Sequence, residues 1–311
     1  MSKRVLVTCA QMQVELPAHR ARIEAAGYEV VAPPIPGQHF KATELAEYMP
    51  GTVGIIAGDD ELNRQFFEAS PDLQVLIRWG IGMDSVDHAA AAEHGVIVAN
   101  TPGVFGEEVA DSAMAYILLL ARGHNEVDQA VRSGAWPKRE GISLSASTLG
   151  VVGLGGIGRS VAMRGLGFGM TVGGYDPYVA SDMVPDQVRL EADLATLLAE
   201  SRFVVLTCPL TPETRHLIDA SAVALMRRDA YLINVARGAV VDEDALVDAL
   251  ATGSIAGAGL DVFEVEPLPA ESPLRGMSNV ILGAHNGSNT REGVVRASAR
   301  AVDRLLEALG A

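Results

Sequence analysis

Short runs of β-branched and other apolar residues alternate with longer segments of helical periodicity along nearly the whole chain. In the first hundred residues five such runs predict β-strands, at 5–8, 28–31, 53–57, 75–78 and 96–100. The intervening segments, such as ELNRQFFEAS and DHAAAAEHG, have helical patterns. Strands that alternate with helices are typical of parallel sheets with helical crossovers, so the pattern predicts an α/β fold.

The strand series stops at a helical stretch, roughly 107–132, and then resumes. The second series predicts strands at 148–154, 170–176, 203–209, 230–236, 255–263 and 279–284. A chain of 311 residues also exceeds the size at which one core usually keeps growing, so we expect two α/β domains. The longest apolar run, AMAYILLLA at 113–121, is shorter than the roughly 20 residues of a membrane span. We interpret it as a buried helix.

Composition narrows the classes of partner. The balance of 24 basic and 39 acidic residues gives a net charge of −15, which argues against nucleic acid or an anionic membrane as a partner. The start, MSKRVLVTCAQ, has too short an apolar stretch for a signal peptide. Cys9 and Cys208 have no metal-ligand spacing, so the sequence indicates neither a disulfide framework nor a metal site. We expect a cytoplasmic protein.

A dinucleotide fingerprint lies in the second series. Residues 153–158 read GLGGIG, a G-x-G-x-x-G between a predicted strand and the helical segment RSVAMRGLGFG. Gly153 permits a tight turn, Gly155 lets the backbone approach a pyrophosphate, and Gly158 allows close packing of helix on strand. The alternative is a glycine turn that serves packing alone.

The next predicted strand ends in Asp176, where a carboxylate would accept hydrogen bonds from a ribose 2′-hydroxyl. The same charge would repel a 2′-phosphate, and no Arg or Lys occurs at 177–180. The sequence therefore favours NAD over NADP.

Hydride transfer at an alcohol needs a group that exchanges a proton with the oxygen. His285 follows a predicted strand and begins a loop, which is where open α/β sheets place their ligands. Arg237 is placed similarly, next to Gly238, and its planar fork of donors suits a carboxylate. We interpret His216 as a packing or capping residue on a helix. The other histidines are expected at the surface: His19, His39, His88, His94 and His124.

These residues belong to stretches that together resemble the D-isomer specific 2-hydroxyacid dehydrogenase family, and its phosphoglycerate dehydrogenase-like branch in particular. The resemblance covers nearly the whole chain. The matching stretches, besides the fingerprint, are RWGIGMDSVD (78–87), VIVANTPG (96–103), CPLTPET (208–214), NVARGAVVDEDAL (234–246), LDVFEVEP (260–267) and AHNG (284–287).

The resemblance implies a catalytic set of Arg237, Glu266 and His285. Glu266 would hydrogen-bond the ring of His285 and favour its imidazolium, and Arg237 would hold the substrate carboxylate. The implied substrate-binding residues are Arg78, Ile81, Gly82, Arg237 and His285. The implied NAD-binding residues are Gly153, Gly155, Gly156, Ile157, Gly158, Asp176, Cys208, Pro209, Thr214, Val235, Ala236, Asp261, His285 and Gly287. Glu264 has no implied role, and we interpret it as solvated.

The family's architecture implies a Rossmann-type dinucleotide-binding domain inserted into a flavodoxin-like substrate domain. Residues 1–100 and 288–311 would form the substrate domain and 101–287 the NAD-binding domain, with the substrate between them. The segment 122–148 resembles the family's dimer arm, so we expect a homodimer.

The far end of the substrate stays open, with 3-phosphoglycerate, hydroxypyruvate, glyoxylate or a related acid as candidates. Phe105 could narrow the pocket, whereas Glu107 and Glu108 either disfavour a phosphate or cap a helix. Lys138 and Arg139 are candidates for an anionic tail or for a partner subunit's site. The alternative function is an NAD-sensing, corepressor-like protein without turnover. Formate dehydrogenase is disfavoured because its members carry an amide at the position of Glu266.

Overall fold

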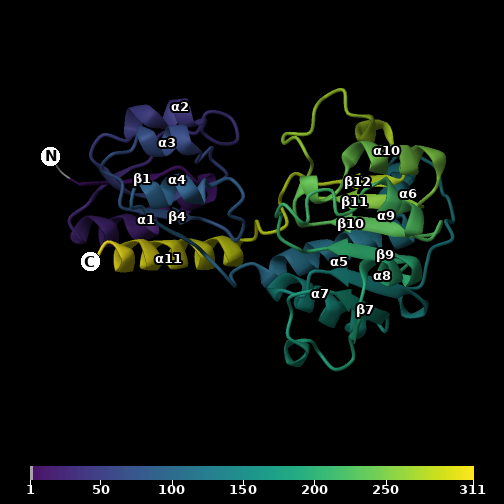
Figure 1. The fold of residues 1–311 in the computed structure, drawn as a ribbon. Helices are drawn as coiled ribbons and strands as arrows, with labels where there is room; N and C mark the ends of the chain where they lie inside the picture. Colours follow the sequence, from purple (N-terminus) through teal and green to yellow (C-terminus); the bar gives the residue numbers. More distant parts are fainter. Residues whose placement is uncertain (1–2) are drawn as a thin grey trace. The chain divides into compact units, whose positions relative to one another are not determined.

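The structure is a computed structural model that describes residues 3–311, and it divides into two compact units. The first, here the terminal unit, contains the chain up to Phe105 together with Asn289–Ala311, and the second, here the central unit, is Gly106–Ser288. Figure 1 shows that each unit is built on one sheet with helices around it. The predicted α/β class is confirmed.

The terminal unit contains a five-stranded parallel sheet in the order β2-β1-β3-β4-β5. Its strands are β1 (Arg4–Val7), β2 (Glu29–Val31), β3 (Thr52–Ala57), β4 (Val75–Arg78) and β5 (Ile97–Asn100). Its helices are α1 (Ala10–Ala25), α2 (Ala42–Leu45) with the 3-10 turn η1 (Ala46–Tyr48), α3 (Arg64–Glu68), α4 (His88–Glu93) and α11 (Arg291–Ala308). The chain's last helix, α11, packs beside α1 and over β3 and β4, so both ends of the chain build one unit (Figure 1).

The central unit contains a seven-stranded parallel sheet in the order β12-β11-β10-β9-β6-β7-β8. Its strands are β6 (Thr148–Val152), β7 (Thr171–Tyr175), β8 (Arg189–Leu190), β9 (Phe203–Leu206), β10 (Tyr231–Asn234), β11 (Gly257–Leu260) and β12 (Val280–Leu282). The chain runs outward from β6 to β8 and then returns to β9 on the other side of β6. The strand order therefore reverses between β6 and β9, where open α/β sheets form a crevice at their carboxyl ends.

Helices cover both faces of this sheet: α5 (Gly106–Arg122), α7 (Gly156–Gly167), α8 (Leu194–Glu200), α9 (Ala220–Leu225) and α10 (Glu243–Thr252). Helix α6 (His124–Arg132) follows α5. Short 3-10 turns are η2 (Leu144–Ala146), η3 (Ser181–Met183), η4 (Gly238–Val240) and η5 (Pro273–Gly276). Aspartates cap three of the helices: Asp193, Asp219 and Asp242 each accept a hydrogen bond from the amide of the third helical residue.

Helix α5 carries the long apolar run and buries Val109, Ala113, Ile117 and Leu120 at helical spacing, as predicted. Of the helices in residues 3–311, none combines the length and apolar character needed to cross a membrane. The helical stretch predicted over 107–132 is confirmed as two helices, because Gly123 adopts a left-handed conformation with φ of 58° and separates α5 from α6.

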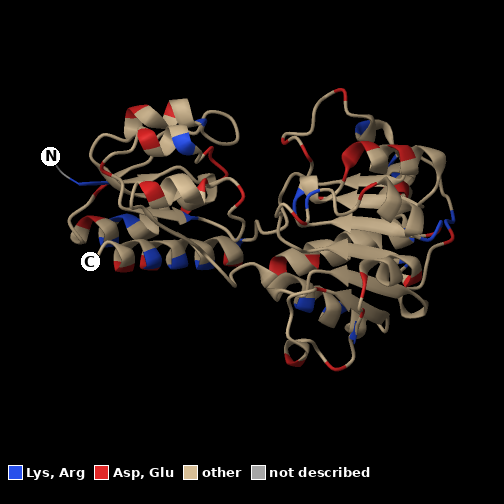
Figure 2. Cartoon of the chain, in the orientation of Figure 1, with Lys and Arg blue, Asp and Glu red and all other residues tan. Residues whose placement is uncertain are grey.

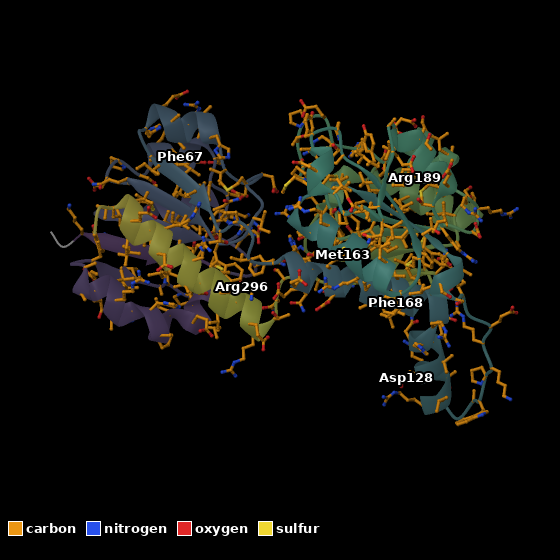
Figure 3. The ribbon with its side chains drawn as sticks, turned by 90° about the horizontal axis from the view of Figure 1, so that it is seen from below. Phe67, Asp128, Met163, Phe168, Arg189 and Arg296 are labelled. Atoms are coloured by element: carbon orange, nitrogen blue, oxygen red, sulfur yellow. The ribbon has the colours of Figure 1, made fainter. Side chains whose placement is uncertain are left out.

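Helix α6 has no buried residue, and with the segment after it projects from the rest of the central unit, as the position of Asp128 shows in Figure 3. Trp136 follows on this segment and is 81% exposed. Acidic side chains lie on both units, and the basic side chains of α11 are interspersed with acids (Figure 2).

Candidate active site

Three neighbouring strands bring the predicted catalytic residues to one edge of the central sheet. Arg237 follows β10, Glu266 lies on the loop after β11, and His285 follows β12. These strands are adjacent and parallel, so their carboxyl ends lie side by side. Residues far apart in the sequence therefore meet because of the strand order.

His285 and Glu266 form a direct pair. Nδ1 of His285 lies 2.7 Å from Oε2 of Glu266, and the other carboxylate oxygen accepts a hydrogen bond of 2.9 Å from the amide of Phe263. The two side chains are 28% and 26% exposed, so the pair is partly desolvated but reachable. The carboxylate thus faces Nδ1 of the imidazole rather than Nε2.

The backbone of His285 is unusual. Its φ of 51° lies in the left-handed region, which costs a non-glycine residue about 1–3 kcal/mol and persists only where its surroundings hold it. Here the surroundings are the backbone and side chain of Asp261. The carbonyl of Asp261 accepts the amide of His285 at 2.7 Å.

The carboxylate of Asp261 is 4% exposed and accepts hydrogen bonds from the amides of Asn286, at 3.2 Å, and Gly287, at 2.8 Å. The hydroxyl of Tyr116, from α5, donates to the same carboxylate at 2.9 Å. Asp261 therefore holds the turn that carries His285. Its implied contact with the nicotinamide stays a prediction.

The Arg237 turn is shaped by Asn234, the last residue of β10. The amide group of the Asn234 side chain donates to the carbonyl of Arg237 at 2.9 Å, and its oxygen accepts from the amide of Ala236 at 3.0 Å. Next to Arg237, a Cβ on Gly238 would lie 1.8 Å from the carbonyl carbon of Phe263. Only glycine lets the Arg237 turn lie against the loop that carries Glu266.

Glu264 is exposed, as predicted, and it also has partners of its own. Its Oε1 lies 2.6 Å from Nε2 of His216, and its amide donates to the carboxylate of Glu243 at 3.1 Å. Burial raises the pKa of Glu243 above its ordinary value. His216 is not helical, which corrects the prediction, since it lies in a turn with φ of 52°. Two histidines with left-handed backbones thus bind the two glutamates of one loop.

The glycine turn fits a dinucleotide. Gly153 has φ of 91°, and a Cβ on Gly158 would lie 1.9 Å from the carbonyl oxygen of Gly153, so the turn is tight and α7 begins directly on it. A Cβ on Gly155 or Gly156 would meet nothing within 4 Å. Open space at the N-terminus of a twelve-residue helix is what a pyrophosphate requires. Ile157 follows within the first turn of α7.

Asp176 follows β7 beside this turn. One of its oxygens accepts from the amide of Leu154 at 2.8 Å, and the other from the amides of Tyr178, at 2.9 Å, and Val179, at 3.1 Å. A carboxylate has about four lone-pair sites, so capacity for a ribose hydroxyl is left.

The remaining predicted NAD-binding residues follow β9 and β10. The backbone of Cys208 packs against the glycine turn, because a Cβ on Gly153 would lie 2.7 Å from the amide nitrogen of Cys208. Thr214 donates to the carbonyl of Pro209 at 2.7 Å and closes the loop after β9. Val235 and Ala236 are buried directly after β10.

The predicted substrate residues Arg78, Ile81 and Gly82 belong to the terminal unit. Arg78 is buried at the end of β4, and its guanidinium bonds to Asp59 and to the carbonyl of Trp79. The turn after it is fixed from β5, where the side chain of Asn100 donates to the carbonyl of Ile81 at 2.7 Å. Ile81 is exposed and Gly82 is partly exposed.

The residues whose roles the sequence left open have partners of their own. Phe105 is buried against Trp79, with ring centroids 5.2 Å apart. Glu107 and Glu108 lie in the first turn of α5, and Glu107 also forms a 2.9 Å ion pair with Arg164 of α7. Arg139 forms an ion pair with Glu126 of its own chain. Lys138 is exposed.

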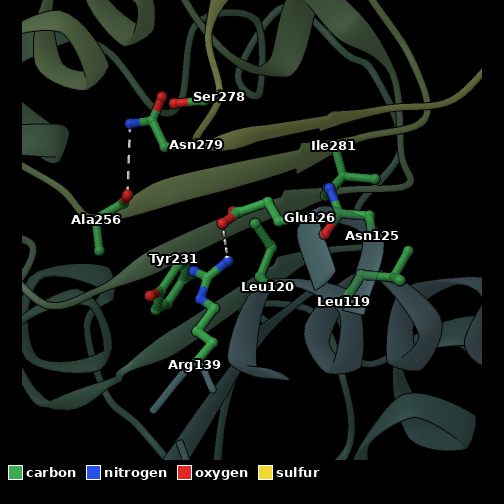
Figure 4. Close-up of a pocket in the computed structure, with 10 residues that line it drawn as sticks. All are labelled: Leu119, Leu120, Asn125, Glu126, Arg139, Tyr231, Ala256, Ser278, Asn279 and Ile281. Atoms are coloured by element: carbon green, nitrogen blue, oxygen red, sulfur yellow. Dashed lines mark hydrogen bonds and ion pairs between the residues drawn. The ribbon is translucent and has the colours of Figure 1, made fainter. Parts of the chain in front are cut away.

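A cavity of about 210 Å³ lies elsewhere in the central unit. Figure 4 shows it between Leu119 and Leu120 of α5 and residues such as Tyr231 and Asn279. Tyr231 begins β10 and Asn279 precedes β12, so the cavity lies at the amino ends of the strands. His285 lies at the opposite, carboxyl ends. Across residues 3–311, no group of three or more His, Cys, Asp or Glu side chains is arranged to hold a metal ion.

Comparison with known proteins agrees with this geometry. Residues 114–287 match the family described as "D-isomer specific 2-hydroxyacid dehydrogenase, NAD binding domain". The chain belongs to this family. It is therefore an oxidoreductase of the dehydrogenase class with NAD as cofactor, and the predicted Rossmann-type domain within a two-domain α/β fold is confirmed.

Individual members of the family resemble much of the chain. Glyoxylate/hydroxypyruvate reductase B of Pectobacterium carotovorum is 41% identical over 88% of this chain and 89% of its own length. D-3-phosphoglycerate dehydrogenase of Methanocaldococcus jannaschii is 39% identical over 80% of this chain, a region that is 48% of that longer protein. The crystal structure of a D-lactate dehydrogenase from Aquifex aeolicus with NAD and lactic acid is similar with a TM-score of 0.87 at 27% identity, covering 99% of this chain and 96% of that one.

Proposed function

We propose that this dehydrogenase interconverts a small D-2-hydroxyacid and its 2-ketoacid, with glyoxylate, hydroxypyruvate and 3-phosphoglycerate as the candidate substrates. The contact of 2.7 Å between His285 and Glu266, on the same sheet edge as Arg237, carries the proposal. The names of the relatives support it, since they are called reductases or dehydrogenases of such acids. Those names give no support to an NAD-sensing protein without turnover.

In this proposal His285 exchanges the proton at the substrate oxygen. During reduction its imidazolium donates a proton from Nε2 to the carbonyl oxygen, and during oxidation the neutral ring accepts the hydroxyl proton. Glu266 stabilises the imidazolium through a charge-assisted hydrogen bond to Nδ1. The guanidinium of Arg237 binds the substrate carboxylate.

The nucleotide would be held by the Gly153–Gly158 turn, by Asp176 and by the segments after β9 and β10. When bound, the reduced cofactor NADH would supply a hydride to the second carbon of the ketoacid, and oxidised NAD would accept one from the hydroxyacid. It stays a prediction that the amides of Ile81 and Gly82 and the side chain of Arg78 contact the substrate. The assignment of residues 1–100 and 288–311 to substrate binding is likewise proposed; the structure divides the chain after Phe105 and after Ser288.

We also propose a homodimer that forms through residues 122–148. The projection of α6 and the exposure of Trp136 support this assignment, because a large aromatic ring in water is typical of a surface that meets a partner.

The experiment is a panel of 2-ketoacids with NADH, followed by absorbance, on the wild-type protein and His285→Ala. We expect turnover of at least one small acid and a loss of about 10²-fold or more in the variant. His88→Ala, an exposed histidine at the start of α4, is the control and should retain full activity. Undiminished turnover in His285→Ala would overturn the role of His285. Binding of NADH without turnover of any acid would overturn the proposed function.

A further inference from the structure

The contact of Tyr116 with Asp261 joins helix α5 to the turn that carries His285. Tyr116 lies 145 residues before Asp261 in the sequence, and its hydroxyl donates to Oδ1 of Asp261 at 2.9 Å. We propose that Tyr116 is a positioning residue for His285 and acts through Asp261. The proposal rests on the proposed function, in which His285 is the acid and base.

Asp261 holds three consecutive residues of the turn. Its carbonyl accepts the amide of His285, Oδ1 accepts the amide of Asn286, and Oδ2 accepts the amide of Gly287. The left-handed backbone of His285 depends on such bonds, because a histidine disfavours this conformation by itself. Rotation of the carboxylate would loosen two of the three bonds. The Tyr116 hydroxyl is a fourth donor to Asp261 and fixes the direction of Oδ1.

The sheet is shaped to admit the tyrosine. A Cβ on Gly283 would lie 2.1 Å from the hydroxyl oxygen of Tyr116, and a Cβ on Gly259 would lie 2.8 Å from its Cβ. Glycines in β11 and directly after β12 thus leave the space that the ring and its hydroxyl fill. A larger residue at either position would displace the ring.

The hydroxyl is held as a donor over the physiological range. Burial, together with the charge of Asp261 and the hydrogen bond to it, raises the pKa of Tyr116 above its ordinary value. The proton therefore stays on the phenol, and the bond to the carboxylate is a charge-assisted one.

The test is Tyr116→Phe, which keeps the ring and removes only the hydroxyl. Three measurements are made: steady-state kinetics over a range of pH with the best 2-ketoacid, amide hydrogen exchange by NMR, and a double-mutant cycle with Asp261→Asn. Tyr231→Phe is the matched control, because Tyr231 is a partly buried tyrosine of the same unit at the amino end of β10.

We expect Tyr116→Phe to lower kcat by about tenfold, as small misplacements of a reacting group do. The limb of the pH profile that reports His285 should move, and exchange at Asn286 and Gly287 should accelerate. In the Asp261→Asn background, the added Tyr116→Phe change should have little further effect. Tyr231→Phe should alter none of these readouts.

A wild-type kcat, pH profile and exchange rate in Tyr116→Phe would overturn the proposal, and so would fully additive effects in the cycle. A loss of thermal stability with an unmoved pH limb would show a merely structural role and would also overturn it. The exchange rates need no substrate. Failure of the wild-type protein to turn over any acid therefore counts against the proposed function, whereas unchanged exchange counts against Tyr116.

Discussion

Nδ1 of His285 lies 2.7 Å from Oε2 of Glu266, and two residues earlier in the same loop Glu264 lies 2.6 Å from His216. A substitution in the pair of Glu264 and His216 can therefore serve as the control for a substitution in the pair of Glu266 and His285. Glu266→Gln should lower kcat for ketoacid reduction by about 10- to 100-fold, because an amide stabilises the imidazolium less than a carboxylate does. Glu264→Gln should retain kcat within about twofold. Equal losses in both variants would show that the loop, rather than the His285 pair, is sensitive.

Asp176 should set the choice of nucleotide. Replacement by Ser removes the charge that disfavours a 2′-phosphate, so kcat/KM should fall with NADH and rise with NADPH, by about tenfold each. Since the carboxylate also orders the amides of Leu154 and Tyr178, some of the loss with NADH will come from the turn itself. The exposed Asp182 in η3 provides the control variant Asp182→Asn. An unchanged ratio of the two cofactors would refute this role.

Two glycines of α7 should respond oppositely to alanine. At Gly158 the new Cβ would lie 1.9 Å from the carbonyl oxygen of Gly153, so the turn must open. We expect Gly158→Ala to lower the free energy of unfolding by about 1–3 kcal/mol or more and to abolish tight NADH binding. At Gly167, in the same helix, a Cβ meets nothing within 4 Å, and alanine there should stabilise by about 0.4–1 kcal/mol. Urea denaturation and NADH fluorescence measure both effects.

The two cysteines should resist alkylation in the folded protein. Burial raises the pKa of Cys208 to about 11 and that of Cys9 to about 12. A raised pKa keeps the unreactive thiol form through neutral pH, so reaction with iodoacetamide should be slow at pH 8 and accelerate only toward pH 10 and above. In urea both thiols should react at the rate of an ordinary cysteine. Rapid modification at pH 7 under native conditions would contradict this.

Trp136 should stabilise the proposed dimer. Trp136→Ser should shift the mass measured by analytical ultracentrifugation toward the monomer, because the ring offers a large apolar area to a partner. Tyr178, which is 86% exposed but lies after β7, supplies the control variant Tyr178→Ser. A wild-type protein that sediments as a monomer would rule out the arm as a dimer contact.

The sequence was informative wherever function depends on position along a strand. Gly153, Asp176, Arg237 and His285 all follow apolar runs, and the carboxyl ends of parallel strands are where such residues become a site. The pairing of His285 with Glu266 was expected from the family resemblance rather than from spacing. The strands themselves were recognised within a few residues, except for the two-residue β8.

Contacts that depend on tertiary packing were not predicted. Tyr116 lies within the apolar run of α5. The only sign in the sequence that it has a partner is that the hydroxyl of a buried tyrosine usually needs one. The sequence predicts a helix at His216, yet tertiary contacts hold it in a left-handed turn. The family resemblance implies no role for Glu264, and no spacing rule links it to His216, which lies 48 positions earlier. The apolar pattern predicts the helical stretch over 107–132 but does not mark its division into α5 and α6 at Gly123.

The closeness of Gly238 to the backbone of Phe263 has a mechanical consequence. Two segments that touch main chain to main chain cannot slide past each other, whereas segments joined by side chains can repack. Arg237, proposed to bind the substrate carboxylate, and Glu266, which hydrogen-bonds the ring of His285, thus lie on two segments that are held rigidly against each other. We expect the two segments to open together, as one cooperative unit, rather than separately.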